Sequence, residues 1–190
     1  MVVKIHRSNG GTTGCASSPL SSSQDLSTIN DRIFVQIASY RDPECQWTLK
    51  DMFEKAANPD RVFAGVVWQY IHAEDKHCFT IETRPHQVRM DRINARFSKG
   101  VCWARARTQQ LWQGEEFTLQ IDSHTRFEPG WDEKLIQMCG QTGSPKPVFT
   151  CYPPAYGRPD KRDTGFIFSM QAKGFDRHGV FTMQSRPIKV

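Results

Sequence analysis

Apolar segments rich in β-branched residues alternate with helix-like segments along most of the chain, and this alternation limits the possible folds most strongly. The segments that predict strands are 33–38, 62–68, 88–93, 117–121, 148–151 and 167–173. Apolar residues at helical spacing predict helices over 48–57, 100–112 and 131–139. Strands that alternate with helices form a mainly parallel sheet with helices on its faces. The sequence therefore predicts an α/β fold.

The first thirty residues have a different composition from the rest. Residues 9–14 and 17–23 are rich in glycine, serine and threonine, and such segments cannot bury a core. We therefore expect 1–30 to be a disordered Ser/Gly-rich tail. Residues 31–190 would then form one domain, which is a usual size for a single domain.

Charge and cysteine usage limit the partners and the compartment. The net charge of +5 suggests an anionic partner, such as a phosphorylated ligand, nucleic acid or a membrane surface. No apolar run approaches the roughly 18 residues of a membrane-spanning helix, and no secretory signal is visible at the start. The six cysteines are scattered singly with no CxxC pair, which favours reduced thiols over a disulfide framework or a zinc site. We expect a cytoplasmic protein without a membrane partner.

Nucleic-acid binding is an alternative explanation of the basic charge. Trp47, Trp68 and Phe97 accompany many arginines, and stacking aromatics beside basic residues are typical of such proteins. However, no nucleic-acid motif is present and the aromatic residues are not regularly spaced. We therefore expect these aromatic side chains to belong to the core, and we expect no nucleic-acid partner.

Two predicted strands end in dense polar clusters. Residues 39–42 follow the strand at 33–38, and residues 122–126 follow the strand at 117–121. Ligands of open α/β sheets bind outside the carboxyl ends of the strands. If the two strands are parallel neighbours, both clusters face the same crevice, which makes it the predicted binding site.

Asp122 and His124 are the candidate metal ligands of this crevice. They lie two residues apart just beyond a strand end, so both side chains can turn toward one point. A carboxylate with an imidazole suits Mn²⁺ or Zn²⁺ better than Mg²⁺. Two protein ligands leave positions for phosphate oxygens and water. For an isolated Asp-x-His triplet, a solvated loop with a turn-forming aspartate is the ordinary alternative.

Two arginines are candidates for contacts with a diphosphate. Arg41 lies in the first polar cluster, and Arg105 lies in the predicted helix at 100–112. A guanidinium offers paired donors that match phosphate oxygens. The alternatives are an ion pair between Arg41 and Asp42, and a solvent-exposed helix position for Arg105.

Several motifs in a fixed order resemble one enzyme family. They are Ile37-Ala38-Ser39-Tyr40-Arg41-Asp42-Pro43-Glu44-Cys45, Ala104-Arg105, Leu111-Trp112-Gln113-Gly114-Glu115, Leu119-Gln120-Ile121-Asp122-Ser123-His124-Thr125-Arg126-Phe127, Trp131-Asp132 and Tyr152-Pro153-Pro154. Together they resemble the N-acetylglucosaminyltransferases of the glycosyltransferase-A fold that modify hydroxyproline on the F-box adaptor subunit of SCF ubiquitin ligases. The resemblance covers roughly residues 31–186.

The resemblance implies a set of functional properties. The donor would be UDP-N-acetylglucosamine, the reaction would retain the anomeric configuration, and a divalent cation, Mn²⁺ by expectation, would be required. Asp122 and His124 would bind the metal, and Ser39, Arg41, Arg105 and Asp122 would lie at the nucleotide. The acceptor would be a hydroxyproline-type protein hydroxyl in the cytoplasm. No residue of this chain is assigned a catalytic role toward the sugar.

The family pattern extends further than this chain does. Family members continue past the point that matches Lys189-Val190, and the continuation would carry acceptor-side residues and a further histidine ligand. The expected architecture is therefore the Rossmann-like nucleotide-binding half of a glycosyltransferase-A fold. Two functions follow: an active glycosyltransferase, or a truncated, inactive module that binds UDP, a UDP-sugar or a protein.

Overall fold

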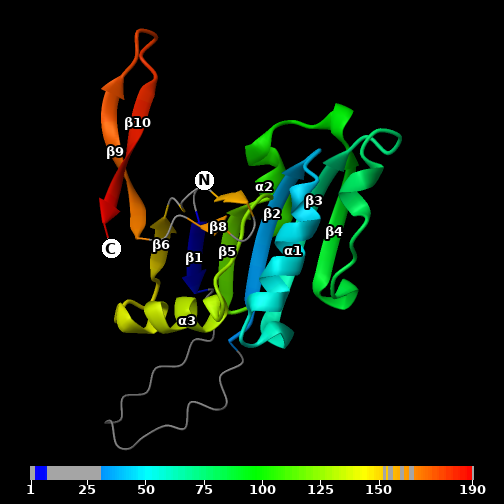
Figure 1. Ribbon diagram of the computed structural model, residues 1–190, viewed down its shortest axis with the longest axis horizontal. Coiled ribbons are helices and arrows are strands. Elements are labelled where there is room, and N and C mark those ends of the chain that lie inside the picture. The colour runs from blue at the N-terminus through cyan, green and yellow to red at the C-terminus, as the bar shows by residue number, and fades with distance from the viewer. Residues whose placement is uncertain are drawn as a thin grey trace, which may run out of the picture.

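The computed structural model describes residues 3–7, 31–151, 153, 156–158, 161–162 and 165–189. Its main part is a six-stranded sheet with the strand order β4-β3-β2-β5-β1-β6 (Figure 1). The strands are β1 (Val3–Arg7), β2 (Ile33–Tyr40), β3 (Val62–Tyr70), β4 (Val88–Asn94), β5 (Phe117–Asp122) and β6 (Val148–Cys151). Strands β2 to β5 run parallel, and β1 is antiparallel to both of its neighbours. The predicted α/β fold with a mainly parallel sheet is confirmed.

In the described part of the chain, three α-helices connect and cover the strands. They are α1 (Glu44–Lys55), α2 (Val101–Gln109) and α3 (Trp131–Gln141), with short 3₁₀ turns at Pro59–Arg61, Lys76–Phe79, Pro85–Gln87 and Ala95–Phe97. Helix α1 begins earlier than the sequence predicts. The Asp42 carboxylate accepts the backbone N–H of Glu44 at 2.9 Å and so supports the first turn, whereas Thr48, an expected cap, is buried within the helix.

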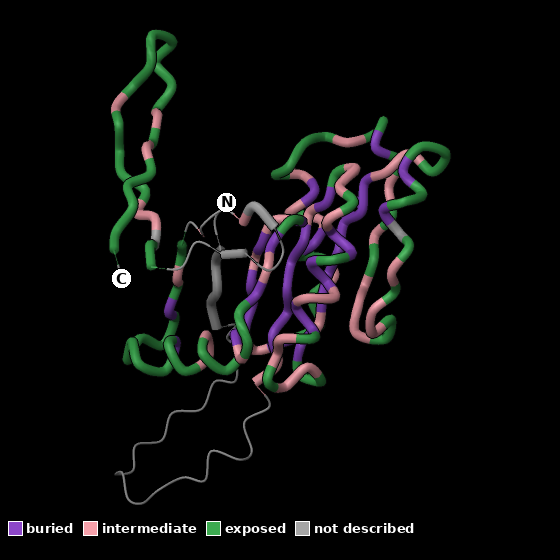
Figure 2. Tube along the Cα trace, in the orientation of Figure 1, coloured by how far each residue is buried: buried purple, intermediate pink, exposed green. Residues whose placement is uncertain are grey.

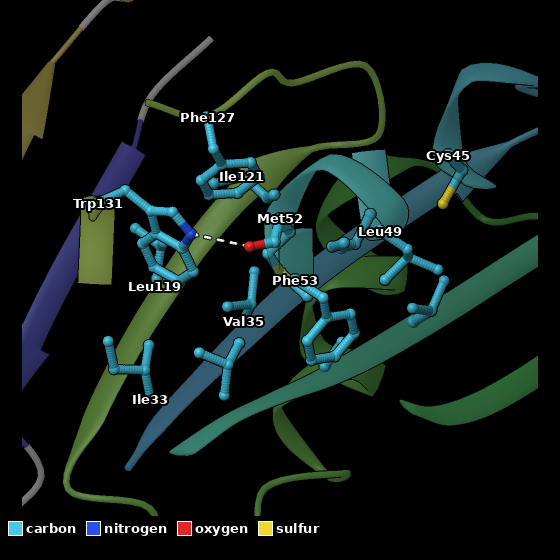
Figure 3. Packing of buried hydrophobic residues seen from close by; sticks show 14 of the residues in the cluster. Ile33, Val35, Cys45, Leu49, Met52, Phe53, Leu119, Ile121, Phe127 and Trp131 are labelled. Carbon is cyan, nitrogen blue, oxygen red and sulfur yellow. Dashed lines mark hydrogen bonds between the residues drawn. The ribbon is translucent and has the colours of Figure 1, made fainter. Parts of the chain in front are cut away.

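Helices pack on both faces of the sheet. Successive side chains of a strand point to opposite faces, so Ile33, Val35 and Ile37 of β2 join the core under α1 and α3 (Figure 3). On the other face Gln36 Oε1 accepts a hydrogen bond from Thr108 of α2 at 3.3 Å. This packing explains why β2 is buried along nearly its whole length (Figure 2).

A tryptophan ties α3 to α1 in this core. Trp131 stacks at a tilt on Phe127, with 4.7 Å between the ring centroids. Its indole N–H donates to the backbone carbonyl of Met52 at 2.9 Å (Figure 3). The bond satisfies the one polar atom of a large buried ring, so the chain segment after β5 is fixed against α1.

Strand β3 passes so close to the buried Phe34 that we expect an added methyl group at Gly65 to destabilise the protein. A Cβ on Gly65 would lie 2.3 Å from Cζ of Phe34 and 3.2 Å from Cβ of Leu111. Phe34 is completely buried, with the Arg89 guanidinium 5.4 Å from its ring centroid. We expect Gly65→Ala to lower the free energy of unfolding by about 1–3 kcal/mol, as overpacked cores do. Urea denaturation measures this change.

A second glycine provides the matched control. Gly140 lies in α3, and an added Cβ there meets nothing within 4 Å. Gly140→Ala should therefore be neutral or stabilise the helix by up to about 1 kcal/mol. Equal unfolding free energies for the Gly65→Ala and Gly140→Ala variants would contradict the packing described here.

The structure differs from the sequence prediction near the N-terminus. Residues 3–7, expected in the tail, form β1 between β5 and β6. The sequence Val-Lys-Ile-His-Arg alternates apolar and polar residues, which is a strand pattern. The Gly/Ser-rich stretches that follow give residues 1–30 as a whole the composition of a disordered tail. The remainder of the expected tail, residues 1–2 and 8–30, lies outside the described residues.

The C-terminal region is a two-stranded hairpin. It consists of β9 (Phe166–Phe175) and β10 (Phe181–Lys189), paired antiparallel. A second small pair is formed by β7 (Tyr156–Arg158) and β8 (Lys161–Arg162). The strand predicted at 167–173 is confirmed, whereas β10 was not predicted. The hairpin stands apart from the six-stranded sheet in Figure 1, and most of its residues are exposed (Figure 2).

Two further expectations concern cysteines and membrane spans. Every cysteine in the described part of the chain is a free thiol: Cys45, Cys78, Cys102, Cys139 and Cys151. This agrees with the prediction of reduced thiols, and Cys15 lies outside the described residues. Within the described ranges, no helix combines the length and apolar character needed to cross a bilayer.

Candidate functional site

The two polar clusters lie at the carboxyl ends of neighbouring parallel strands. Strands β2 and β5 pair in parallel, with Ala38 opposite Asp122. The residues that follow β2 therefore meet those that follow β5 at one edge of the sheet. This adjacency, which the sequence prediction required, is confirmed, and it places the candidate site where α/β sheets bind ligands.

Asp122 forms an ion pair with Arg105 at this edge. Nη2 of Arg105 lies 3.2 Å from Oδ1 of Asp122, and both side chains are partly exposed. Arg105 comes from α2 and Asp122 from the last position of β5. The structure thus brings together two of the predicted site residues. Arg105 is partly exposed and is engaged by Asp122, rather than pointing into solvent without a partner.

His124 is hydrogen-bonded to a carboxylate of the other cluster. Its Nδ1 lies 3.0 Å from Oδ2 of Asp42. The same oxygen accepts the Ser123 hydroxyl at 2.5 Å, and Oδ1 accepts the Glu44 N–H at 2.9 Å. Burial alone would raise the pKa of Asp42, but these hydrogen bonds outweigh it and hold the pKa below its ordinary value. The His124 side chain is 58% exposed.

Arg41 has partners other than the expected one. Its Nε donates to Asp75 at 2.9 Å, and its Nη2 lies 2.6 Å from a Glu74 oxygen. The alternative of an Arg41–Asp42 ion pair is therefore wrong. The cause is the backbone: Arg41 has a φ of 50°, and its N–H donates to the carbonyl of Gln69 on β3. Contact between Arg41 and a nucleotide stays a prediction.

Ser39 lies inside the protein beneath this edge. Its side chain is completely buried, next to the buried Cys45 thiol at the start of α1. Burial raises the pKa of Cys45 to about 12, and the buried Ser39 hydroxyl has no hydrogen-bond partner among the described residues. The thiol is consequently protonated and unreactive at neutral pH. The contact of Ser39 with a nucleotide stays a prediction.

Helix α1 holds the loop that carries His124. The Thr48 hydroxyl donates to the carbonyl of Ser123 at 2.6 Å and accepts the N–H of Thr125 at 3.0 Å. Further along, Asp51 accepts the N–H of Phe127 at 2.6 Å. Sequence reasoning missed this role, since Thr48 was considered only as a helix cap. No local pattern reveals the contact, because its partners are more than 70 residues away.

Removing one hydroxyl tests this support. Thr48→Val keeps the shape of the buried side chain but leaves a buried carbonyl and a buried N–H without their partner. We expect the free energy of unfolding to fall by about 1–3 kcal/mol. Thr48→Ser keeps the hydroxyl and should be less destabilising. The interpretation fails if chemical denaturation shows the valine variant to be as stable as the serine variant.

The described residues contain no cluster of three or more histidine, cysteine, aspartate or glutamate side chains arranged for a metal ion. Asp122 and His124, the two predicted ligands, each have a protein partner, Arg105 and Asp42 respectively. Each nevertheless keeps a second donor atom, Oδ2 and Nε2, without a hydrogen bond to the described residues. The metal assignment therefore stays a prediction.

Comparison with known proteins supplies the family. A family model described as Glycosyltransferase (GlcNAc) matches residues 32–85 and 80–190. A search of curated proteins gave no match. The match includes all of the parallel strands and all three α-helices, and this α/β architecture is consistent with a glycosyltransferase-A type domain. The chain therefore belongs to the GlcNAc glycosyltransferase family.

Proposed function

We propose that the protein transfers N-acetylglucosamine from UDP-N-acetylglucosamine to a protein hydroxyl, of the hydroxyproline type, in the cytoplasm. One observation carries the proposal. In a chain of the glycosyltransferase family, Asp122 and His124 follow the end of β5, beside Arg105 from α2 and next to the end of β2. This edge brings together candidate metal ligands and a positive charge, the groups that would bind a nucleotide diphosphate.

The donor atoms at this edge suit a divalent cation. Asp122 supplies a carboxylate oxygen, and His124 supplies Nε2, because its Nδ1 is engaged with Asp42. One oxygen and one nitrogen favour Mn²⁺ or Zn²⁺ over Mg²⁺. When bound, such an ion stabilises the negative charge that develops on the departing diphosphate. These two residues are the ones we expect to hold it.

Arg105 would act on the donor as a second positive charge. Its guanidinium is paired with Asp122 at 3.2 Å, which keeps it beside a proposed metal ligand. Guanidinium groups bind phosphate oxygens through paired N–H donors. We therefore expect Arg105 to orient the diphosphate and to neutralise part of its charge.

A donor-turnover assay tests the proposed function. The full chain is incubated with UDP-N-acetylglucosamine and Mn²⁺, with and without a hydroxyproline peptide, and UDP release is compared with a chelator control. We expect metal-dependent turnover, and a retaining reaction would release the sugar first as its α-anomer by proton NMR. Turnover equal to the chelator control would contradict an active transferase, and a β-anomer would contradict retention.

A further inference from the structure

We infer that Asp42 is a positioning residue that fixes the ring of His124, so that Nε2 is the nitrogen presented to the metal. This inference rests on the proposed function, because it assigns a role to the contact behind a proposed ligand. The contact joins the segment after β2 to the segment after β5, which are 82 residues apart in sequence. It is the only hydrogen bond that the described residues show for the His124 ring.

The hydrogen bonds of Asp42 determine which nitrogen carries the proton. An ionised carboxylate only accepts hydrogen bonds, so Nδ1 of His124, at 3.0 Å, must be the donor. The neutral imidazole then carries its lone pair on Nε2, which is the form that binds a metal. The proton is assigned from this partner. The same arrangement, a carboxylate behind a histidine ligand, orients metal-binding rings in many proteins.

The surroundings of Asp42 hold its carboxylate in one orientation. Both oxygens are used, since Oδ1 accepts the Glu44 N–H at the start of α1 and Oδ2 also accepts the Ser123 hydroxyl. The side chain is only 19% exposed. Arg41, its neighbour in sequence, does not compete for the carboxylate, because it pairs with Asp75. The Asp42 side chain is thus fixed toward His124.

An amide at this position would reverse the proton arrangement. In an Asp42→Asn variant, the side-chain oxygen would keep the Glu44 N–H as its donor, which turns the NH₂ group toward Ser123 and His124. His124 Nδ1 would then have to accept a hydrogen bond, and its proton would move to Nε2. The ligand nitrogen would be blocked although the variant has nearly the same shape.

Two measurements on the full chain test the inference. The first is ¹⁵N NMR of His124 in the metal-free protein at mildly alkaline pH, with its signals assigned by their loss in His124→Ala. We expect the Nδ1–H form in the wild type and the Nε2–H form in Asp42→Asn. The second is Mn²⁺ binding in the presence of UDP, for which we expect Asp42→Asn to lose about 10–100-fold in affinity.

Asp60→Asn is the matched control. Asp60 is 90% exposed and pairs with Arg84 at the opposite end of β3, so its amide variant should bind Mn²⁺ like the wild type. If the wild type binds Mn²⁺ and the Mn²⁺ affinity of Asp42→Asn is within about twofold of the wild-type affinity, the role of Asp42 is refuted while the metal site stands. If the wild type does not bind Mn²⁺ with UDP, the proposed metal site fails first. If Asp42→Asn does not fold, an Nε2–H form in the wild type still refutes the inference.

Discussion

Replacing Asp122 with alanine is expected to abolish Mn²⁺-dependent binding of UDP. Asp122 is one of two proposed protein ligands, and it also fixes Arg105 at the same point. The variant thus loses a ligand charge and leaves the guanidinium of Arg105 without its partner. We expect an affinity loss beyond the roughly 10–100-fold that is typical when only the partner of a ligand is removed. Titration calorimetry with UDP and Mn²⁺ measures the loss.

Two controls separate lost ligation from lost folding. Asp122 is partly exposed at the end of β5, so the variant should unfold at nearly the wild-type denaturant concentration. Asp60→Asn removes a carboxylate from the exposed ion pair with Arg84, and Asp60 precedes β3 at the end opposite to the candidate site. This variant should bind UDP normally. Unchanged UDP affinity in a folded Asp122→Ala protein would show that the metal assignment is wrong.

The second large effect concerns stability and lies at Glu115. This carboxylate is completely buried. It accepts Arg89 Nη2 at 2.5 Å and the backbone N–H of Gln113 at 2.9 Å. Glu115→Ala would leave the largely buried charge of Arg89 without its partner. We expect the free energy of unfolding to fall by about 3–5 kcal/mol, measured by urea denaturation.

An exposed glutamate gives the comparison for this prediction. Glu54 of α1 pairs with Lys50 at 3.7 Å, and both side chains are exposed. Glu54→Ala should change the free energy of unfolding by no more than about 1 kcal/mol. Similar losses for the Glu54 and Glu115 variants would refute the structural role of the buried pair.

The same pair gives a pH dependence with a defined sign. Burial alone would raise the pKa of Glu115, but the hydrogen bonds from Arg89 and from the Gln113 N–H outweigh it and hold the pKa below the ordinary value of 4.5. A carboxyl whose pKa is lower in the folded protein stabilises it above its unfolded pKa. That stability is lost as the pH falls through the folded pKa. Glu115→Gln should lack this acid-dependent loss, whereas the wild type shows it below about pH 4.5.

Local sequence patterns were sufficient to predict the parallel strands and the sheet edge at which the two polar clusters meet. The apolar runs at 33–38 and 117–121 are strands because they are buried on both faces, which leaves a continuous hydrophobic pattern. The polar residues that follow them therefore had to meet at one edge once the strands paired. Asp122 and Arg105 were both expected there, and the structure brings them together.

The pairings between side chains were not predictable in the same way. His124 meets Asp42, and Arg41 meets Asp75, across 82 and 34 residues of sequence respectively. Only the pairing of the strands in the folded sheet brings these side chains close together in space. The alternative of an Arg41–Asp42 ion pair is wrong because Arg41, with a φ of 50°, pairs with Asp75 instead.

One motif of the family resemblance has a structural explanation. The segment 111–115 closes a turn in which the Trp112 indole donates to the Glu115 carbonyl at 3.0 Å, and Arg89 donates to the Leu111 carbonyl at 2.9 Å. These contacts lead into β5 from the end opposite to the candidate site. The motif ends in Glu115, which is completely buried and paired with Arg89, so we expect its carboxylate to stabilise the fold.

Pulsed electron paramagnetic resonance of Mn²⁺ with UDP and the full chain tests the central claim most directly. If Asp122 and His124 hold the metal, the Mn²⁺ signal shows coupling to an imidazole nitrogen. Replacing His124 with alanine removes that coupling, and replacing the exposed His86 with alanine does not. A spectrum without imidazole coupling, or one that is unchanged in His124→Ala, would contradict the proposed metal site.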